Sequence, residues 1–446
     1  ATAQLAALPT ATLAGTGTIT ANASIDERGR TSPQLTLTRS AKRDGVVSDV
    51  SLEFTRNNAI FPGFGYGPLT RRDASGALIY GGDASVVGIA GGDGGNVTIT
   101  ATNGTVGITG AGAVINSMGG SALQVGGGNG GLVDVFAKGA VTVRNINSYG
   151  GNLTAGGGSG NTGGGNGGDV TLESSQQSVT MSGALQTLGG WSKGTAAPGG
   201  NGGRILIKAD GDVSLYNARS MGGDQALGSG NGGQGGHVSI SSANGNITVS
   251  PDGIEAWGGY GRNGAAGNGG NVELLALATS ATFGQIHVPG IDTGGGHAGS
   301  SLSTTGSTGG AGGSVTVRAG NAVVINEIYS WGGDGAGGSV GGTGGKGGDV
   351  ELTQGTGTLD LSSLRIDATG GAGGTGANGS GVSGDTGNNN VFNPDPSRPA
   401  TSSVRDSRGG MTVNVTVNAT GDGRAMVDAI TAAVKDGVQA AWMANP

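Results

Sequence analysis

The chain has 446 residues, and 103 of them are glycine, several times the usual share of ~7 %. Hydrophobic residues (34 %) and aromatic residues (4 %) supply too few bulky side chains for one large core, and glycine does not recur every third residue as in collagen. Charged residues make up only 12 % and the β-branched residues are patterned, which disfavours disorder. The net charge of −7 argues against a nucleic-acid binder, and the lack of cysteine excludes disulfides and thiolate metal sites.

Residues 1–90 differ from the rest because they hold three of the six phenylalanines and two of the six tyrosines. Alternating stretches at 17–21 and 34–38 predict strands, so we expect a small N-terminal β domain with its own core. The first residues lack the charged and apolar regions of a signal peptide, and whether one has been removed stays open. No apolar run reaches the roughly 18 residues that a spanning helix needs, so no membrane insertion is expected.

Residues 91–390 contain an internal repeat. A glycine pair directly before an alternating apolar segment recurs at intervals of 33 to 43 residues, followed by a second alternating segment and by a short third one that ends at another glycine pair. The order strand, turn, strand, short strand and glycine-rich return predicts an all-β parallel solenoid of about eight coils, on the order of 40 Å tall. The eight pairs begin at Gly94, Gly130, Gly167, Gly202, Gly235, Gly269, Gly312 and Gly347.

The glycine-rich returns are expected to pack as extended polyglycine helices. Chains without Cβ atoms approach closely enough to share backbone hydrogen bonds, which offsets part of the large ordering entropy of glycine. Mobile loops are the alternative.

A large side chain recurs directly before the second glycine pair in six coils. We expect these residues to form a ladder covered by the glycine layer. The alternative is an exposed face that contacts a sugar or a receptor through Tyr149, Trp257 and Trp331. Trp191 and Tyr260 lie within the returns and are better candidates for exposed contacts. The six column residues are Met118, Tyr149, Leu188, Met221, Trp257 and Trp331.

The C-terminal part changes character again. Three prolines among Asn and Ser predict a linker at 391–410, and an alternating strand opens the segment 411–446. An amphipathic helix follows, and its apolar stripe predicts docking on a second copy of the chain or on an attachment partner. The stripe consists of Met426, Ile430, Val434, Val438 and Trp442.

The motifs that would indicate metal binding, nucleotide binding or catalysis are incomplete or missing in this sequence. The glycine-rich calcium nonamer requires an apolar residue where Thr171 and Glu351 stand, so no metal site is expected. No phosphate loop or nucleophile elbow is present, and no cofactor is expected. Carboxylates at near-equivalent coil positions could cleave glycans, but solvated solenoid faces often carry such charges, so the chain is not expected to be an enzyme. These carboxylates are Asp252, Glu255, Asp292 and Glu327.

Two end segments carry a family resemblance. Residues 13–21 (LAGTGTITA) resemble strings in glycine-rich minor tail proteins of bacteriophages, and residues 413–422 followed by a helix are similar to the end of some phage tail proteins. The central repeats resemble both glycine-rich phage tail adhesins and bacterial filamentous-haemagglutinin-type adhesins. No cell-wall sorting motif, C-terminal barrel strand or lipidation cysteine supports the bacterial comparison.

The resemblance implies a non-enzymatic virion protein, a tail fibre, spike or decoration protein that attaches to a host surface. Its partners would be other virion subunits or further copies of itself, and a host glycan or protein. The alternatives are a secreted bacterial adhesin or matrix filament, located outside the cell or on its surface, and a glycan-degrading tailspike.

Overall fold

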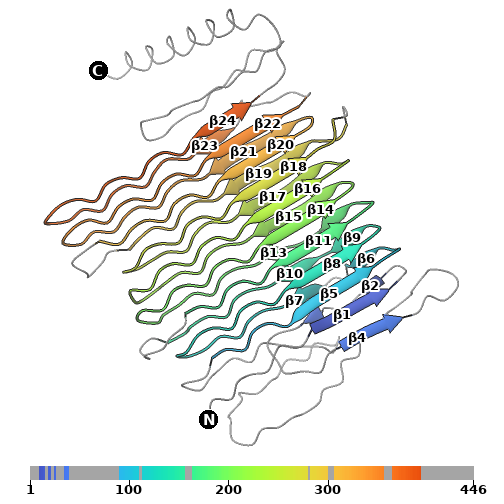
Figure 1. The fold of residues 1–446 in the computed structure, drawn as a ribbon, viewed down its shortest axis with the longest axis horizontal. Coiled ribbons are helices and arrows are strands. Elements are labelled where there is room, and N and C mark those ends of the chain that lie inside the picture. Colours follow the sequence, from blue (N-terminus) through green and yellow to red (C-terminus); the bar gives the residue numbers. More distant parts are fainter. Residues whose placement is uncertain are drawn as a thin grey trace, which may run out of the picture.

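A computed structural model describes residues 90–392, except 110–112, 156–162, 280–281, 300–305 and 356–363, and the backbone of four earlier strands. This part is an all-β solenoid of two parallel sheets without a helix (Figure 1). The strands stack on one side of the molecule, and glycine-rich segments extend from them to the other side. Among the residues described, no helix is long and apolar enough to cross a membrane.

The first sheet contains one strand from each coil. Eight of its strands, separated by seven turns of the solenoid, follow the eight predicted glycine pairs and confirm the predicted architecture. Consecutive strands pair in register, with Val97 opposite Val133 and Val133 opposite Val170. The eight strands are β5 (Asn96–Ala101), β8 (Val133–Ala137), β11 (Val170–Ser174), β14 (Ile205–Ala209), β16 (Val238–Ser242), β18 (Val272–Ala276), β20 (Val315–Ala319) and β22 (Val350–Gln354).

The second sheet contains the second and third strands of each coil. In the earlier coils these are separate: β6 (Val106–Ile108) and β7 (Val114–Asn116), β9 (Val141–Val143) and β10 (Asn145–Asn147), β12 (Val179–Met181) and β13 (Leu185–Gln186). In later coils they merge into one strand with a register shift, first in β15, where Tyr216 alone separates the two runs. The merged strands are β15 (Val213–Arg219), β17 (Ile247–Glu255), β19 (Ile286–Asp292) and β21 (Val323–Tyr329), and β23 (Arg365–Asp367) continues the row.

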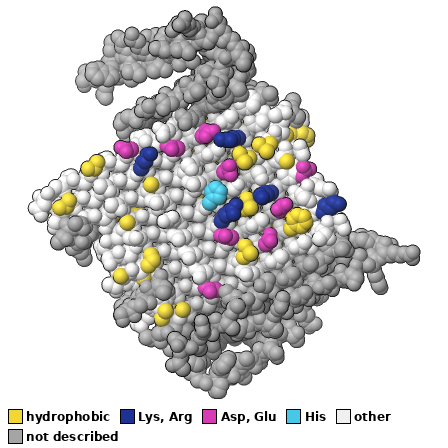
Figure 2. Space-filling model, in the orientation of Figure 1, with side chains coloured by type: hydrophobic (Ala, Val, Ile, Leu, Met, Phe, Trp, Pro, Cys, Tyr) yellow, Lys and Arg dark blue, Asp and Glu magenta, His cyan; other side chains and the backbone are white. Residues whose placement is uncertain are grey.

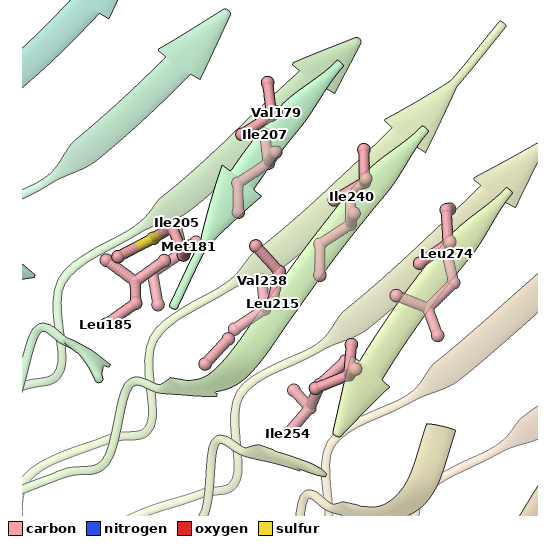
Figure 3. Packing of buried hydrophobic residues seen from close by; sticks show 14 of the residues in the cluster. Val179, Met181, Leu185, Ile205, Ile207, Leu215, Val238, Ile240, Ile254 and Leu274 are labelled. Atoms are coloured by element: carbon pink, nitrogen blue, oxygen red, sulfur yellow. The ribbon is translucent and has the colours of Figure 1, made fainter. Parts of the chain in front are cut away.

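The hydrophobic core lies between the two sheets. Alternate residues of every coil point inward, so Ile205 and Ile207 of the first sheet face Val179 and Met181 of the second (Figure 3). The core consists almost entirely of Val, Ile, Leu and Ala, which explains how the fold forms with so few aromatic residues. Each fully buried Val, Leu or Ile contributes roughly 1.5–3 kcal/mol, and stacked coils repeat this contribution.

The glycine-rich segments form an ordered layer. In each coil an outgoing arm leaves the third strand and a return arm leads back to the first sheet. The two arms exchange backbone hydrogen bonds of 2.7 to 2.9 Å in one continuous zigzag. This pattern confirms the packed polyglycine layer. The zigzag runs through Gly92, Gly120, Gly128, Gly151, Gly165, Gly190, Gly200, Gly223, Gly233, Gly259, Gly267, Gly296, Gly310, Gly333, Gly345, Gly371 and Gly384.

The layer requires glycine for steric reasons. A Cβ atom at Gly165 would overlap the carbonyl oxygen of Gly128, and one at Gly348 would overlap that of Gly313. Buried hydroxyl groups join the layer to the third strands, since Ser148 donates to Gly131 O (2.6 Å) and Thr187 donates to Gly203 O (3.0 Å). In the orientation of Figure 1, charged side chains lie mainly over the strands and few lie on the glycine-rich side (Figure 2).

The two sheets extend beyond the predicted repeat at both ends. Strands β1 (Thr10–Gly15), β2 (Ile19–Ala21) and β3 (Ile25–Asp26) pair with β5, β6 and β7, and β4 (Leu35–Arg39) pairs with β1. Strand β24 (Asn389–Phe392) pairs with β22 and reaches the first residues of the predicted linker. The separate core expected for 1–90, the rest of the linker and the C-terminal strand and helix at 411–446 lie outside the described residues.

Candidate binding surface

The outgoing arms arrange their side chains in columns. A polyglycine-type helix has three residues per turn, so residues three apart point to the same side. The column before each glycine pair and the column after it therefore share one surface. Backbone hydrogen bonds between consecutive coils fix both columns: Gly222 donates to Trp257 O and Gln225 donates to Tyr260 O.

Three columns of side chains form one surface, which we call the outgoing face. The strand column comprises the outward residues of the third strands: Asn116, Asn147, Gln186, Arg219, Glu255, Asp292, Tyr329 and Asp367. The inner arm column is Met118, Tyr149, Leu188, Met221, Trp257, Gly294, Trp331 and Thr369. The outer arm column is Ser121, Asn152, Trp191, Asp224, Tyr260, His297, Asp334 and Ala372.

The large side chains of the inner arm column are half-buried. The prediction of a ladder covered by the glycine layer is therefore wrong, because these side chains project from the outer surface of the layer. Tyr260 is 39 % exposed, and Trp191 is half-buried with the Lys193 Nζ 4.9 Å from the centre of its ring. The structure thus brings Tyr149, Trp191, Trp257, Tyr260 and Trp331 to one face, and their role as receptor contacts stays a prediction.

The aromatic residues crowd most closely around Gly294. The indole of Trp331 lies across this glycine, since a Cβ atom there would be 2.6 Å from Trp331 Cε2. The other arm column adds the His297 ring, which stacks on Trp331 with centroids 4.8 Å apart. The hydroxyl end of Tyr260 lies against Gly299 of the next coil. The rings are therefore held in place by bare backbone and by one another.

The strand column carries the charges of the face. Arg219 pairs with Glu255 (3.1 Å) and Asp252 (3.5 Å). Glu255 and Asp292 are opposite each other in adjacent coils. Burial raises the pKa of Asp292, the nearby Glu255 raises it further, and the N–H of Gly294 (2.9 Å) partly offsets both. Of the four carboxylates that the sequence analysis named, Asp252, Glu255 and Asp292 thus lie close together.

The fourth carboxylate, Glu327, is exposed and lies beside Tyr329. Burial and a hydrogen bond to Glu327 raise the pKa of Tyr329, and the guanidinium of Arg365 lies 5.4 Å from its ring centre. At the other end of the column, burial raises the pKa of Tyr149 to about 12, an effect that the positive charge of Arg219 opposes. The Tyr149 hydroxyl contacts the side chains of Gln186 and Asn147.

The opposite surface of the layer, the return face, is built from amide and carboxylate ladders. The Asn129 Oδ1 accepts the N–H of Asn166 (2.9 Å), and the Asn166 Oδ1 accepts that of Asn201 (2.8 Å). Asp169 and Asp349 accept the N–H groups of Arg204 (2.7 Å) and Asn388 (2.8 Å) in the same way. These side chains satisfy backbone donors that would otherwise point into solvent.

Sequence reasoning missed this capping role. The calcium nonamer pattern does not indicate that Asp169 and Asp349 cap backbone donors, although a polar residue between or after two glycine pairs recurs in most coils and could have signalled this role. Among the described residues, no group of three or more His, Asp and Glu side chains could hold a metal ion. The expected attachment residues Met426, Ile430, Val434, Val438 and Trp442 lie outside the described part.

The chain was compared with protein-family models, with curated proteins and with solved structures. No family model, no curated protein and no solved structure matches it.

Proposed function

We propose that this chain is a non-enzymatic structural protein of a virion, of the tail-fibre or spike kind, which presents the outgoing face to a host surface. One observation carries the proposal. Three of the four tryptophans of the chain, together with Tyr149 and Tyr260, lie on a single face of a hydrogen-bonded glycine layer. The two return-face columns that contain Asn129 and Asp169 hold no tryptophan or tyrosine among the described residues.

Rigidity supports a role in attachment. The aromatic side chains project from a layer whose arms are hydrogen-bonded to each other and from coil to coil, so little conformational freedom is lost when a partner binds. Tryptophan and tyrosine also contribute most to binding energy at recognition surfaces, because they combine large apolar area with a polar group. A column of coils repeats such contacts along the molecule.

A secreted bacterial adhesin or matrix filament would use the same surface. The two proposals differ in what the chain is attached to, and the segment 411–446 is the proposed attachment element in the virion case. Co-sedimentation of the chain with phage particles separates them. Recovery of the chain in the particle fraction supports the virion protein, and recovery only on bacterial cells or in the culture medium supports the adhesin.

Glycan cleavage is a second candidate, favoured by one local arrangement. Asp292, whose pKa is raised, is opposite Glu255 in the adjacent coil and two residues before Gly294. Two neighbouring carboxyl groups, one of which holds its proton more tightly than usual, are the kind of pair that glycoside hydrolysis uses. If polysaccharide incubated with the chain is depolymerised, and Asp292→Asn abolishes this, the protein is a glycan-degrading tailspike.

Adsorption to host cells tests the attachment proposal. The labelled full chain should bind cells, and Trp257→Ala and Trp331→Ala should each reduce binding at least tenfold. Asn166→Ala, on the return face, is the matched control and should bind like the native chain. Equal binding by all variants, or no binding by the native chain, would overturn the proposal.

A further inference from the structure

We propose that the outgoing face binds a neutral glycan across the coils that contain Trp257, Gly294 and Trp331. This inference rests on the proposed attachment function and names the chemical class of the receptor. The site is the part of the outgoing face contributed by four consecutive coils, from Arg219 to Asp334. We call it the aromatic patch.

The arrangement of rings favours a sugar as the ligand. Trp257 and Tyr260 are three residues apart on one arm, and His297 and Trp331 follow from the next two coils. Neighbouring coils in a sheet are ~4.8 Å apart, and residues three apart on a polyglycine-type arm are roughly 9 Å apart. The patch therefore offers several ring faces and edges over a span of a few sugar units. The C–H groups of a pyranose ring pack on such faces through dispersion and burial of apolar area.

The polar groups of the patch are suited to sugar hydroxyls. Glu255, Asp292 and Asp334 border the rings, and their carboxylate oxygens accept hydrogen bonds from hydroxyl groups. The side chain of Asp334 is 47 % exposed, and one of its oxygens lies 3.4 Å from His297 Nδ1. Polar acceptors that surround apolar rings provide both orientation and contact area for a ligand.

The charge of the patch excludes an acidic glycan as the preferred ligand. Four of its positions are acidic: Asp224, Glu255, Asp292 and Asp334. Its one arginine, Arg219, is already paired with Glu255 and with Asp252. A polymer that carries carboxylate, sulfate or phosphate groups would meet these like charges, and the arginines beside the patch, Arg262 and Arg365, already contact Ala226 O and the Tyr329 ring. A neutral polysaccharide avoids this cost.

The rings are held in position before any ligand arrives. Trp331 packs against Gly294 and stacks on His297, and the hydroxyl end of Tyr260 contacts Gly299. Below them, Asp224 Oδ1 accepts the N–H of Tyr260 (2.8 Å) and Asp334 Oδ1 accepts that of Ala372 (2.8 Å). Because these side chains are already ordered, binding costs little of their conformational entropy. Weak contacts with several sugar units can then sum to a measurable affinity.

The test is binding of the purified full chain to immobilised polysaccharides. Probes are neutral hexose and N-acetylhexosamine polymers, with uronic-acid and phosphate-bearing polymers as the acidic set. We expect binding to a neutral polymer, little changed between 50 mM and 500 mM NaCl. Trp257→Ala should weaken it at least tenfold, Tyr260→Ala should weaken it several-fold, and Asn166→Ala should leave it unchanged.

Gly294→Ala adds a variant that keeps every ring. The added methyl group displaces the Trp331 indole, so binding should fall although no aromatic residue is removed. Thermal melting of each variant identifies loss of folding. Because Tyr260 is exposed, Tyr260→Ala is the variant that keeps the test valid if Trp257→Ala does not fold.

The outcomes separate this inference from the proposed function. Salt-sensitive binding to acidic polymers alone, or neutral-polymer binding that is unchanged in the folded variants, overturns the neutral-glycan site. Adsorption to cells without binding to any glycan also overturns it, points to a protein receptor, and leaves the attachment proposal standing. Binding to a neutral glycan through the patch, without adsorption to cells or particles, supports the site and overturns the attachment proposal.

Discussion

The strand half and the glycine half of each coil pair their backbone groups in different ways. In the strand half, side chains such as Ile205 and Ile240 fill a core between two sheets, and hydrogen bonds run from coil to coil. In the glycine half, carbonyl and N–H groups of the zigzag meet directly across the layer, and few larger side chains, such as Leu153 and Gln225, are buried. Both halves provide hydrogen-bond partners for the backbone N–H and C=O groups, but only the strand half depends mainly on the hydrophobic effect.

The difference determines where surface chemistry can be placed. Along the glycine zigzag, larger side chains are placed on the outer surfaces, because a Cβ atom at a zigzag glycine would overlap the backbone of the neighbouring arm. Trp257 is therefore half-buried and Tyr260 is 39 % exposed, although both belong to a hydrogen-bonded segment. The glycine layer acts as a thin, rigid support for a recognition surface.

The largest effect is expected from a side chain introduced inside the glycine layer. In Gly348→Val, the added atoms would overlap Gly313 O and the Ser330 hydroxyl group, and the adjacent coils would have to separate. We expect the melting temperature to fall sharply or the chain not to fold. Gly290→Ala is the matched control, because the nearest atom to its Cβ is Glu327 O at 3.9 Å. Equal melting temperatures for the two variants would contradict a packed layer.

The strand half should respond to loss of side-chain volume instead. Ile240 is fully buried in β16, and Ile240→Ala should lower the free energy of unfolding by roughly 2–5 kcal/mol through lost burial and a cavity. Chemical denaturation measures this change. A cost below ~1 kcal/mol would mean that the space between the sheets is not a tightly packed core.

A smaller effect is expected where the two halves join. Thr187 is buried and donates a hydrogen bond to Gly203 O, and Thr187→Val removes this donor at similar volume. The free energy of unfolding should fall by about 1 kcal/mol. The same column contains Ala256 and Ala368, so a residue without a hydroxyl fits there. Unchanged stability would show that the hydroxyl column does not hold the layer to the strands.

The smallest effect concerns pH. Burial raises the pKa of Asp292 and of Asp134, so the folded chain holds each proton more tightly than the unfolded chain does. The free energy of unfolding therefore decreases as the pH rises from about 4 through the raised values. Asp292→Asn and Asp134→Asn should each make stability less dependent on pH and increase it, relative to the native chain, above that range. Melting temperatures between pH 3.5 and 7 measure both slopes, and slopes equal to that of the native chain would contradict the assignment.

The repeat was predictable because its period is carried by glycine pairs and alternating apolar residues. Gly94 and the pairs after it mark the coils regardless of which side chains fill the core. The fusion of the second and third strands from β15 onward was not predictable, since it depends on whether a bulge such as that at Tyr216 keeps the strand continuous. The number of residues between the two alternating segments does not reveal whether the second and third strands are continuous.

The candidate site was predictable in its residues but not in its geometry. Repeat position predicts Tyr149, Trp257 and Trp331, and a place within the glycine-rich returns predicts Trp191 and Tyr260. Their common face follows from the three-residue turn of the outgoing arm, and their partial exposure follows from the return arm lying on the other side of the layer. Neither the common face nor the exposure can be predicted from the sequence without the course of the outgoing and return arms.

The central claim is that the glycine arms are as ordered as the strands. Amide hydrogen exchange, resolved by residue, tests it most directly because exchange requires the hydrogen bond to open. The account predicts slow exchange at Gly165, Gly200 and Gly233, comparable to that at Ile207 and Ile240 in the first sheet. Exchange of the three glycine amides at the rate of an unstructured peptide, beside protected strands, would contradict it.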